Sequence, residues 1–324
     1  MKLLKGSTLF PSLNSEKNRG SGLQQQASQS KKREMNRRDR WLIVCSQGFT
    51  AIAGLLTLLI VGFLLRETWP ILSSIGLRPF FTDPRWNPTS GEFNLLPIVC
   101  GTLLTSAGAI ALAAPLGILS ALFCQVYAPS PLAKTYRRII ELLAGIPSVV
   151  YGFWGLVVLV PIINRWQPPG QGLFTGIIIL TLMILPTVAL ITQASLSEVP
   201  FAYQQGAIAL GLSRWTQLRH ILLPAARSGV LTGLVLAGGR ALGETMALLM
   251  VCGNVVQVPE SLFSPVRTLT ANIALEMAYA TGDHRAALFV SGLILLLTIA
   301  MLVGIADWLS RAAQPDGVRR GGGQ

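Results

Sequence analysis

The chain has 324 residues, of which 51% are hydrophobic and only 12% are charged. An average soluble domain has about 25% charged residues, so this composition excludes an ordinary soluble protein and indicates one built for a membrane. The formal net charge is +12. The uneven distribution of basic residues across the membrane explains this charge more simply than a nucleic-acid partner does.

Six apolar runs follow one another along the chain, each free or almost free of charge. They cover residues 41–65, 95–124, 142–163, 172–197, 228–252 and 286–306. A helix needs about 20 residues to cross a hydrocarbon core, whereas a membrane strand needs about 10 and alternates in polarity. We therefore expect an all-α integral membrane protein with six transmembrane helices in a domain covering residues 41–306.

The basic residues predict the orientation, because Lys and Arg in short loops are retained on the cytoplasmic side of a membrane. If the amino terminus is inside, the segments facing the cytoplasm hold 19 of the 26 Lys and Arg residues. We therefore predict that both termini are cytoplasmic. Residues 1–40, rich in Ser, Gln, Lys and Arg, then form a flexible basic tail, and residues 307–324 form a carboxyl tail.

The sequence lacks the motifs of several enzyme classes, namely the phosphate-binding loop of ATPases, the HExxH zinc motif and the GxSxG serine motif. The four cysteines stand singly in apolar runs, at Cys45, Cys100, Cys124 and Cys252. Without CxxC spacing, and with two histidines in the chain, they indicate neither a metal site nor a disulfide framework. A transporter, a channel or a membrane scaffold is therefore favoured over an enzyme.

A polar, basic loop covers residues 200–224, between the fourth and fifth apolar runs. Pro200 can begin a first helix, Gly211 suits a left-handed stop, and Ser213 is a good amino-terminal cap for a second helix. The second helix carries one apolar stripe, made of Trp215, Leu218 and Leu222. Such a hairpin could lie on the lipid surface or offer its stripe to a groove in a cytoplasmic partner.

The same loop resembles the coupling motif of binding-protein-dependent ABC importer permeases, in which EAA, three residues and Gly precede nine residues and I-x-L-P. The motif falls on Gln205, Gly206, Ala207, Gly211, Ile221, Leu223 and Pro224. Gln205 and Gly206 depart from the usual Glu and Ala. The resemblance implies that these residues, with Trp215 and Leu218, couple the permease to an ATP-binding subunit.

Longer segments narrow the resemblance to the PstC-type permease of the phosphate ABC importer. They are "GTLLTSAGAIALAAPLGILSALF" (101–123), "ELLAGIPSVVYGFWGLVVLVP" (141–161), "GRALGETMALLMVCGN" (239–254) and "RTLTANIALEMAYATGDHRAALFVSGLIL" (267–295). The similarity covers roughly residues 40–310. It implies a multi-pass protein of the bacterial inner membrane with the type I importer architecture, which cycles between outward and inward access.

The resemblance also implies partners. These are a PstA-type second permease, a dimer of the PstB-type ATPase and a PstS-type phosphate-binding protein. ATP and Mg²⁺ would be used by the ATPase, and this chain would bind no cofactor or metal and would not be an enzyme.

Arg240 and Glu244 are the ionisable residues of the fifth run, and their spacing of four places both on one helical face. Charges at membrane depth are costly and usually face a bundle interior or a wet cavity. The pair is either a structural ion pair, with Glu244 neutralising Arg240, or a site at which Arg240 attracts a passing phosphate. The candidate pathway also includes the hydroxyls of Thr245, Tyr151 and Ser148, although a hydroxyl inside a bundle more often serves packing.

The segments on the outer side have two interpretations. The loop "FFTDPRWNPTSGEFN" (80–94) and residues 253–285 could receive a binding protein. Alternatively, an interfacial aromatic belt could be formed by Trp69, Phe80, Phe81 and Trp86.

Three functional alternatives stay open. A permease for sulfate or molybdate would carry the same features, because any such oxyanion favours a buried arginine. A secondary transporter or channel would transport without an ATPase. A membrane scaffold would have no need of Arg240 and Glu244.

Overall fold

The computed structural model describes residues 37–312. The two predicted tails, 1–40 and 307–324, lie outside this range except for residues 37–40 and 307–312, which are helical. The chain divides into two units, one up to Phe63 and the other from Leu64 onward.

The first unit contains most of helix α2 (Arg37–Ile75), which is longer than the predicted run 41–65. Every side chain from 41 to 60 is exposed within this chain, and most of them are apolar. A helix that is apolar all round requires an apolar environment along its whole surface, which fits a membrane span.

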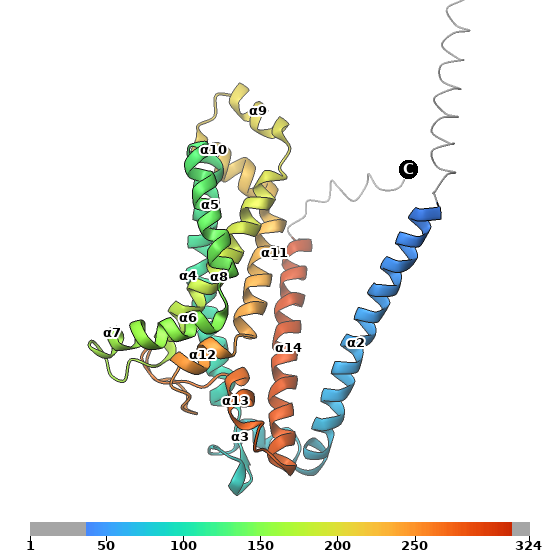
Figure 1. The fold of residues 1–324 in the computed structure, drawn as a ribbon, viewed down its shortest axis with the longest axis vertical. Helices are drawn as coiled ribbons and strands as arrows, with labels where there is room; N and C mark the ends of the chain where they lie inside the picture. The colour runs from blue at the N-terminus through green and yellow to red at the C-terminus, as the bar shows by residue number, and fades with distance from the viewer. Residues whose placement is uncertain (1–36, 313–324) are drawn as a thin grey trace, which may run out of the picture. The chain divides into compact units, whose positions relative to one another are not determined.

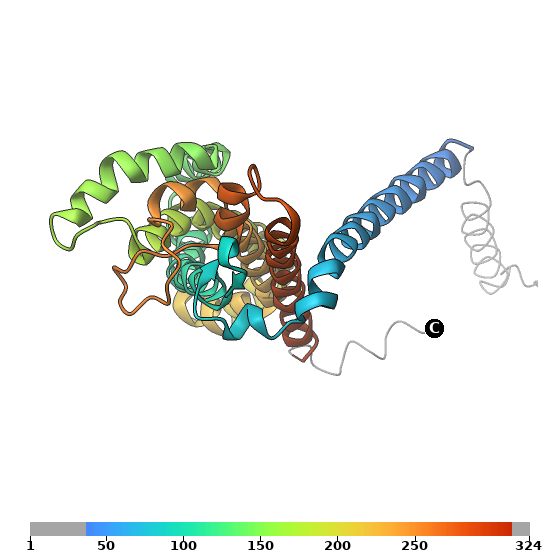
Figure 2. The same ribbon diagram turned by 90° about the horizontal axis from the view of Figure 1, so that it is seen from below.

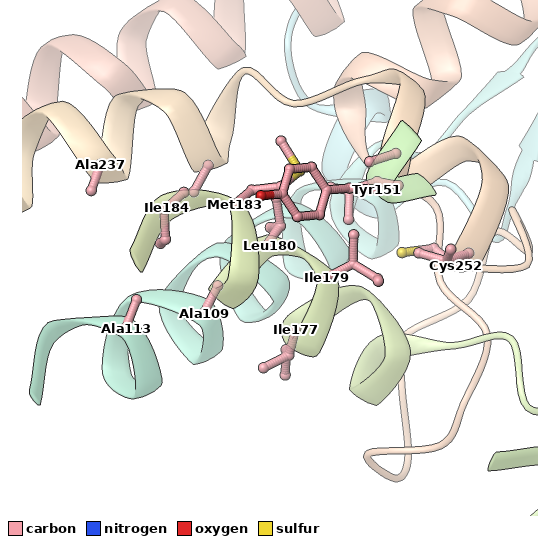
Figure 3. Packing of buried hydrophobic residues seen from close by; sticks show 14 of the residues in the cluster. Ala109, Ala113, Tyr151, Ile177, Ile179, Leu180, Met183, Ile184, Ala237 and Cys252 are labelled. Atoms are coloured by element: carbon pink, nitrogen blue, oxygen red, sulfur yellow. The ribbon is translucent and has the colours of Figure 1, made fainter. Parts of the chain in front are cut away.

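The long helices of the second unit are α4 (Leu96–Leu122), α5 (Ser130–Gly145), α8 (Leu173–Ser197), α11 (Leu223–Leu242) and α14 (Gly282–Ala312). Helix α8 packs against α4, α5 and α11, and α11 packs in turn against α4 and α14 (Figures 1 and 2). At the α4–α8 interface, Ala109 and Ala113 lie opposite larger side chains of α8 such as Leu180 and Ile184 (Figure 3). Small residues on one helix let the two backbones approach closely.

The third predicted run, 142–163, is not one continuous helix. Helix α5 ends at Gly145, and the chain resumes as α6 (Ser148–Trp154), the π-helical turn η3 (Gly155–Leu159) and α7 (Val160–Asn164) after a bend of 91°. The bend has a local cause, because Pro147 has no N–H to donate and forces the preceding Ile146 into an extended conformation (ψ 128°). Within residues 37–312, five helices are long and apolar enough to cross a membrane alone, and six spans result if this bent pair counts as one.

The fifth predicted run, 228–252, is also interrupted and begins earlier than expected. Helix α10 (Arg214–Gln217) continues through the π-helical turn η4 (Leu218–Leu222) into α11, so one helical rod covers residues 214–242. The rod ends at Gly243, and a short helix, α12 (Met246–Val251), follows. A break separates α11 from α12 at residues 243–245.

One end of the bundle carries a small folded cap, called here the hairpin end. Its elements are α3 (Pro79–Thr82), β1 (Trp86–Asn87), the 3-10 turn η1 (Pro88–Ser90), β2 (Glu92–Phe93) and α13 (Leu269–Glu276). The antiparallel pair β1–β2 is the only sheet in residues 37–312. Phe80 and Phe93 are buried here together with Ile71, Leu95 and Ile98.

The predicted aromatic belt is therefore only half right. Phe80 is fully buried and Trp86 is partly buried, because both pack into the hairpin end, whereas Trp69 and Phe81 are exposed. At the opposite end of the bundle lie the π-helical turn η2 (Phe123–Tyr127) and helix α9 (Phe201–Ala209) (Figure 1). We call this the α9 end.

Candidate functional site

The two predicted charged residues lie at the break between α11 and α12, and their surroundings differ. Arg240 lies in the last turn of α11, where a cation is favoured by the helix dipole. Glu244 lies within the break, and its Oε1 accepts a hydrogen bond from the backbone N–H of Ala247 at 3.2 Å. Glu244 therefore caps the first turn of α12.

The expected ion pair between Arg240 and Glu244 is absent from the described structure. The i, i+4 rule requires a continuous helix, and Gly243 ends α11 between the two residues. Glu244 is buried, with 9% exposure, whereas Arg240 is partly buried. Within residues 37–312, Arg240 has no carboxylate within salt-bridge distance and no side-chain hydrogen bond, so its N–H donors stay available to a ligand.

Tyr151 of α6 is one of the predicted hydroxyl residues. It lies close enough to Arg240 for the hydroxyl and the guanidinium to interact electrostatically. Its ring lies beside Leu180 and Met183 of α8 (Figure 3). The hydroxyl donates to the backbone carbonyl of Leu143 at 2.9 Å, across the bend between α5 and α6. The Leu143 carbonyl also accepts from the backbone N–H of Ile146 at 3.3 Å, so Tyr151 adds a second hydrogen bond at the bend, and its oxygen can still accept one.

The other two predicted hydroxyls lie at helix starts. Ser148 is the first residue of α6 and is partly buried. Thr245 lies in the break, and its Oγ1 is 3.4 Å from the carbonyl oxygen of Gly243. Helix α6 packs directly on α12, so Ser148 and Tyr151 of α6 lie on an element adjacent to the helix that follows Thr245.

Gly152 makes the close approach of α6 and α12 possible. A Cβ at residue 152 would lie 2.7 Å from the Cα of Ala247, which is backbone and cannot give way. Any side chain at this position would push α6 away from the break. The glycine therefore keeps Tyr151 on the same side of the bundle as Arg240.

Helix α13 supports the break from the hairpin end, a contact that the sequence analysis missed. Thr270 Oγ1 donates to the carbonyl oxygen of Glu244 at 2.7 Å. The backbone N–H of Leu269 donates to Thr102 Oγ1 of α4 at 2.9 Å. Both contacts join residues far apart in sequence, so no local pattern could have indicated them.

The loop at the α9 end has the predicted local structure. Helix α9 follows Pro200, Gly211 has a left-handed φ of 68°, and the Ser213 side chain accepts from the N–H of Thr216 at 3.2 Å. The glycine-hinged pair of helices is therefore confirmed. Gln205 and Gly206 are exposed, and Ala207 is buried.

The apolar stripe of the second helix does not face outward as a whole. Leu218 and Leu222 are buried within the chain's own core against Leu122 and Leu196, because α10 runs straight into the bundle. Ile221 and Leu223 are partly buried, and Pro224 is exposed.

Other apolar side chains of this loop are exposed. These are Phe201, Tyr203, Ile208, Leu210 and Trp215. We call these five residues the loop apolar surface.

Comparison with known proteins agrees with this architecture. Residues 113–315 match the protein family described as "Binding-protein-dependent transport system inner membrane component". The phosphate transport system permease protein PstC of Mesorhizobium japonicum is 37% identical over 286 residues, covering 80% of this chain and 87% of the relative. PstC of Pasteurella multocida is 34% identical, with 81% and 86% covered, and the probable ABC transporter permease protein YqgH of Bacillus subtilis is 40% identical, with 72% and 79% covered.

Solved structures show the same fold. A chain of a bacterial alginate ABC transporter in complex with its periplasmic protein matches with a TM-score of 0.60 at 19% identity, covering 85% of this chain and 96% of that one. A chain of the MetNI methionine ABC transporter matches with a TM-score of 0.53 at 17% identity, covering 79% and 98%. The predicted all-α importer permease architecture is thereby confirmed.

The family assignment settles the class and location of the protein. Its members are transport components of the inner membrane, so the chain is a multi-pass membrane transport subunit and not an enzyme. The four cysteines are free. The chain belongs to the family of binding-protein-dependent transport system inner membrane components, and PstC-type permeases are among its relatives.

Proposed function

We propose that this chain is the permease subunit of an ATP-driven phosphate importer and forms half of the anion pathway. The observation that carries the proposal is Arg240, a partly buried guanidinium without a carboxylate partner in the described structure, at the break between α11 and α12. The names of the PstC relatives support phosphate as the anion.

The chemistry of Arg240 suits an oxyanion in transit. A guanidinium presents a planar fork of N–H donors that matches phosphate oxygens, and it stays charged in a partly buried site. Tyr151 adds an oxygen that can accept from a protonated phosphate. Ser148 at the start of α6 and Thr245 just before α12 are further hydroxyls. Glu244 forms no ion pair with Arg240. Its negative charge within the break lowers the affinity of the site for an anion, so that phosphate can leave again.

The proposed complex contains a PstA-type second permease, a PstB-type ATPase dimer and a PstS-type phosphate-binding protein. In the proposed orientation the α9 end and both termini face the cytoplasm, and the hairpin end faces outward. This chain binds no cofactor or metal, and ATP and Mg²⁺ act in the ATPase subunits.

Coupling is assigned to the loop 200–224 through its exposed residues. The loop apolar surface, with Gln205 and Gly206 beside it, offers apolar contacts to a cleft in the ATPase. The continuous rod 214–242 joins this loop to Arg240. Closure of the ATPase dimer would therefore move the break directly, which supports a mechanism of alternating access.

The test is phosphate uptake by the complete complex in sealed vesicles with ATP inside. Arg240→Gln should reduce the maximal uptake rate at least about tenfold, because it removes the cation but keeps a side chain of similar length. Arg165→Gln is the matched control, since Arg165 is exposed after α7 and should transport normally. Normal uptake by Arg240→Gln would refute the proposed pathway. If sulfate or molybdate inhibits the uptake of labelled phosphate more strongly than unlabelled phosphate does, the substrate is that oxyanion and not phosphate.

A further inference from the structure

A buried carboxylate at the hairpin end collects donors from three separate segments. Glu276, the last residue of α13, is 8% exposed. Its Oε1 accepts from Arg267 Nη1 at 2.6 Å. Its Oε2 accepts from Trp86 Nε1 of β1 at 3.0 Å and lies 2.8 Å from His284 Nε2 of α14. We call Trp86, Arg267, Glu276 and His284 the Glu276 clamp.

Arg267 extends the clamp to α12. Its Nε donates to the carbonyl oxygen of Asn254 at 2.9 Å, and its Nη1 also donates to Asn272 Oδ1 at 3.1 Å. Asn254 in turn donates from Nδ2 to the carbonyl oxygen of Leu249 in α12 at 2.7 Å. A buried ion pair is tolerated only when its remaining donors and acceptors are satisfied in this way, so removing one partner affects the whole set.

Helix α13 connects the clamp to the break that carries Arg240. Its first turn holds Thr270, whose hydroxyl bonds the Glu244 carbonyl, and its last residue is Glu276. Six residues of helix separate the two contacts by about 9 Å. The same short rigid element therefore touches the hairpin at one end and the break at the other.

The clamp is also a polar contact between the hairpin and the rest of this end of the bundle, beside the apolar packing of Phe93. The Trp86 ring meets the His284 ring edge-on, with centroids 6.3 Å apart, while its N–H bonds Glu276. Arg85 and Glu92 beside it form an exposed salt bridge that does not enter the clamp. A displacement of the hairpin thus acts on Glu276 through Trp86.

We propose that Glu276 is a positioning residue that transmits contact at the hairpin to the Arg240–Glu244 break. The inference rests on the proposed function, in which the hairpin end faces outward, and it takes this end as the docking site of the binding protein. Docking moves Trp86, Glu276 shifts α13, and Thr270 carries the shift to the backbone of Glu244. The clamp therefore makes ATP hydrolysis responsive to the loaded binding protein.

The test uses the complete complex in vesicles or nanodiscs and measures ATP hydrolysis with and without phosphate-loaded binding protein. Glu276→Gln should leave assembly and basal hydrolysis near wild type and reduce the stimulation by binding protein about tenfold, which corresponds to ~1.4 kcal/mol. Trp86→Phe keeps an aromatic ring and removes one donor, so it should give a smaller loss of the same kind. Arg165→Gln, which is exposed after α7 and lies outside the segments 80–94 and 253–285, is the control and should be stimulated normally.

Two outcomes would count against the proposal. Normal stimulation of both Glu276→Gln and Trp86→Phe would overturn it. Equal losses of basal and stimulated hydrolysis in both variants would also overturn it, because the clamp would then be needed only for folding. Phosphate uptake by the wild-type complex is measured in parallel. Absence of uptake in the wild type would refute the proposed function, whereas normal wild-type uptake with normally stimulated variants would refute only the role of the clamp.

Discussion

In the loop at the α9 end, buried residues that stabilise the permease can be distinguished from exposed residues that are proposed to contact the ATPase. Leu218 is 1% exposed and packs in the chain's own core, whereas Ile208 of α9 is 65% exposed. Truncating a buried leucine to alanine costs about 2–5 kcal/mol. Burying an exposed isoleucine in an interface contributes about 1.5–3 kcal/mol, which is a factor of about ten to one hundred in affinity.

We therefore expect opposite effects from two alanine variants. Leu218→Ala should lower the melting temperature of the purified permease, and any loss of ATPase binding should follow the loss of folded protein. Ile208→Ala should leave the melting temperature unchanged and weaken binding of the ATPase about tenfold or more. Thermal unfolding monitored by fluorescence, together with binding of labelled ATPase in detergent, measures both quantities on the same samples.

The reasoning is refuted by the reverse pattern. If Leu218→Ala weakens ATPase binding at an unchanged melting temperature while Ile208→Ala binds normally, the stripe of the second helix faces the partner after all. Arg219→Gln is a suitable control, because Arg219 is exposed on the same helix and off the apolar stripe.

Three further variants test the elements that position the site. Gly152→Leu should lower the yield of folded permease in size-exclusion chromatography, since a Cβ there would lie 2.7 Å from the Ala247 backbone. Gly211→Ala should destabilise the loop by about 1–2 kcal/mol because φ is 68°, and faster amide hydrogen exchange in α9 should report it. Tyr151→Phe should reduce uptake less than Arg240→Gln does, because it removes one hydrogen-bonding group of the proposed pathway and leaves the cation in place; normal uptake would exclude Tyr151 from the pathway.

Local chemistry explains why the loop 200–224 was predictable. Pro200, Gly211 and Ser213 act on the backbone within a few residues of themselves, so their effects do not depend on the rest of the fold. The apolar runs were predictable for a similar reason, because length and the absence of charge alone decide whether a helix can cross a bilayer.

The two breaks show where this local reasoning stops. Pro147 explains locally why the helix of the third run breaks, but it does not predict the bend of 91° or the close packing of α6 on α12 around Gly152. In the fifth run the i, i+4 rule assumes that the helix continues, yet Gly243 ends it. Arg240 and Glu244 were thus predicted to reach each other on one helical face, and this geometry is wrong.

The stripe of the second loop helix illustrates a different limit. Amphipathic periodicity shows that one face of a helix is buried, but it does not identify the protein that buries it. Leu218 and Leu222 pack in this chain, whereas Trp215 stays exposed. The Glu276 clamp was missed altogether, because Trp86 and Glu276 are 190 residues apart.

The position of the break gives the proposed transport cycle a physical basis. From the α9 end, a continuous helical rod reaches Arg240, so movement of the loop displaces the guanidinium. From the hairpin end, α13 reaches the Glu244 carbonyl through Thr270. The two residues are not paired with each other, so each can move with its own element. Under the proposed function, the ATPase would therefore move the cation and the binding protein would move the carboxylate, and the distance between the two charges would determine how tightly the pathway holds its anion.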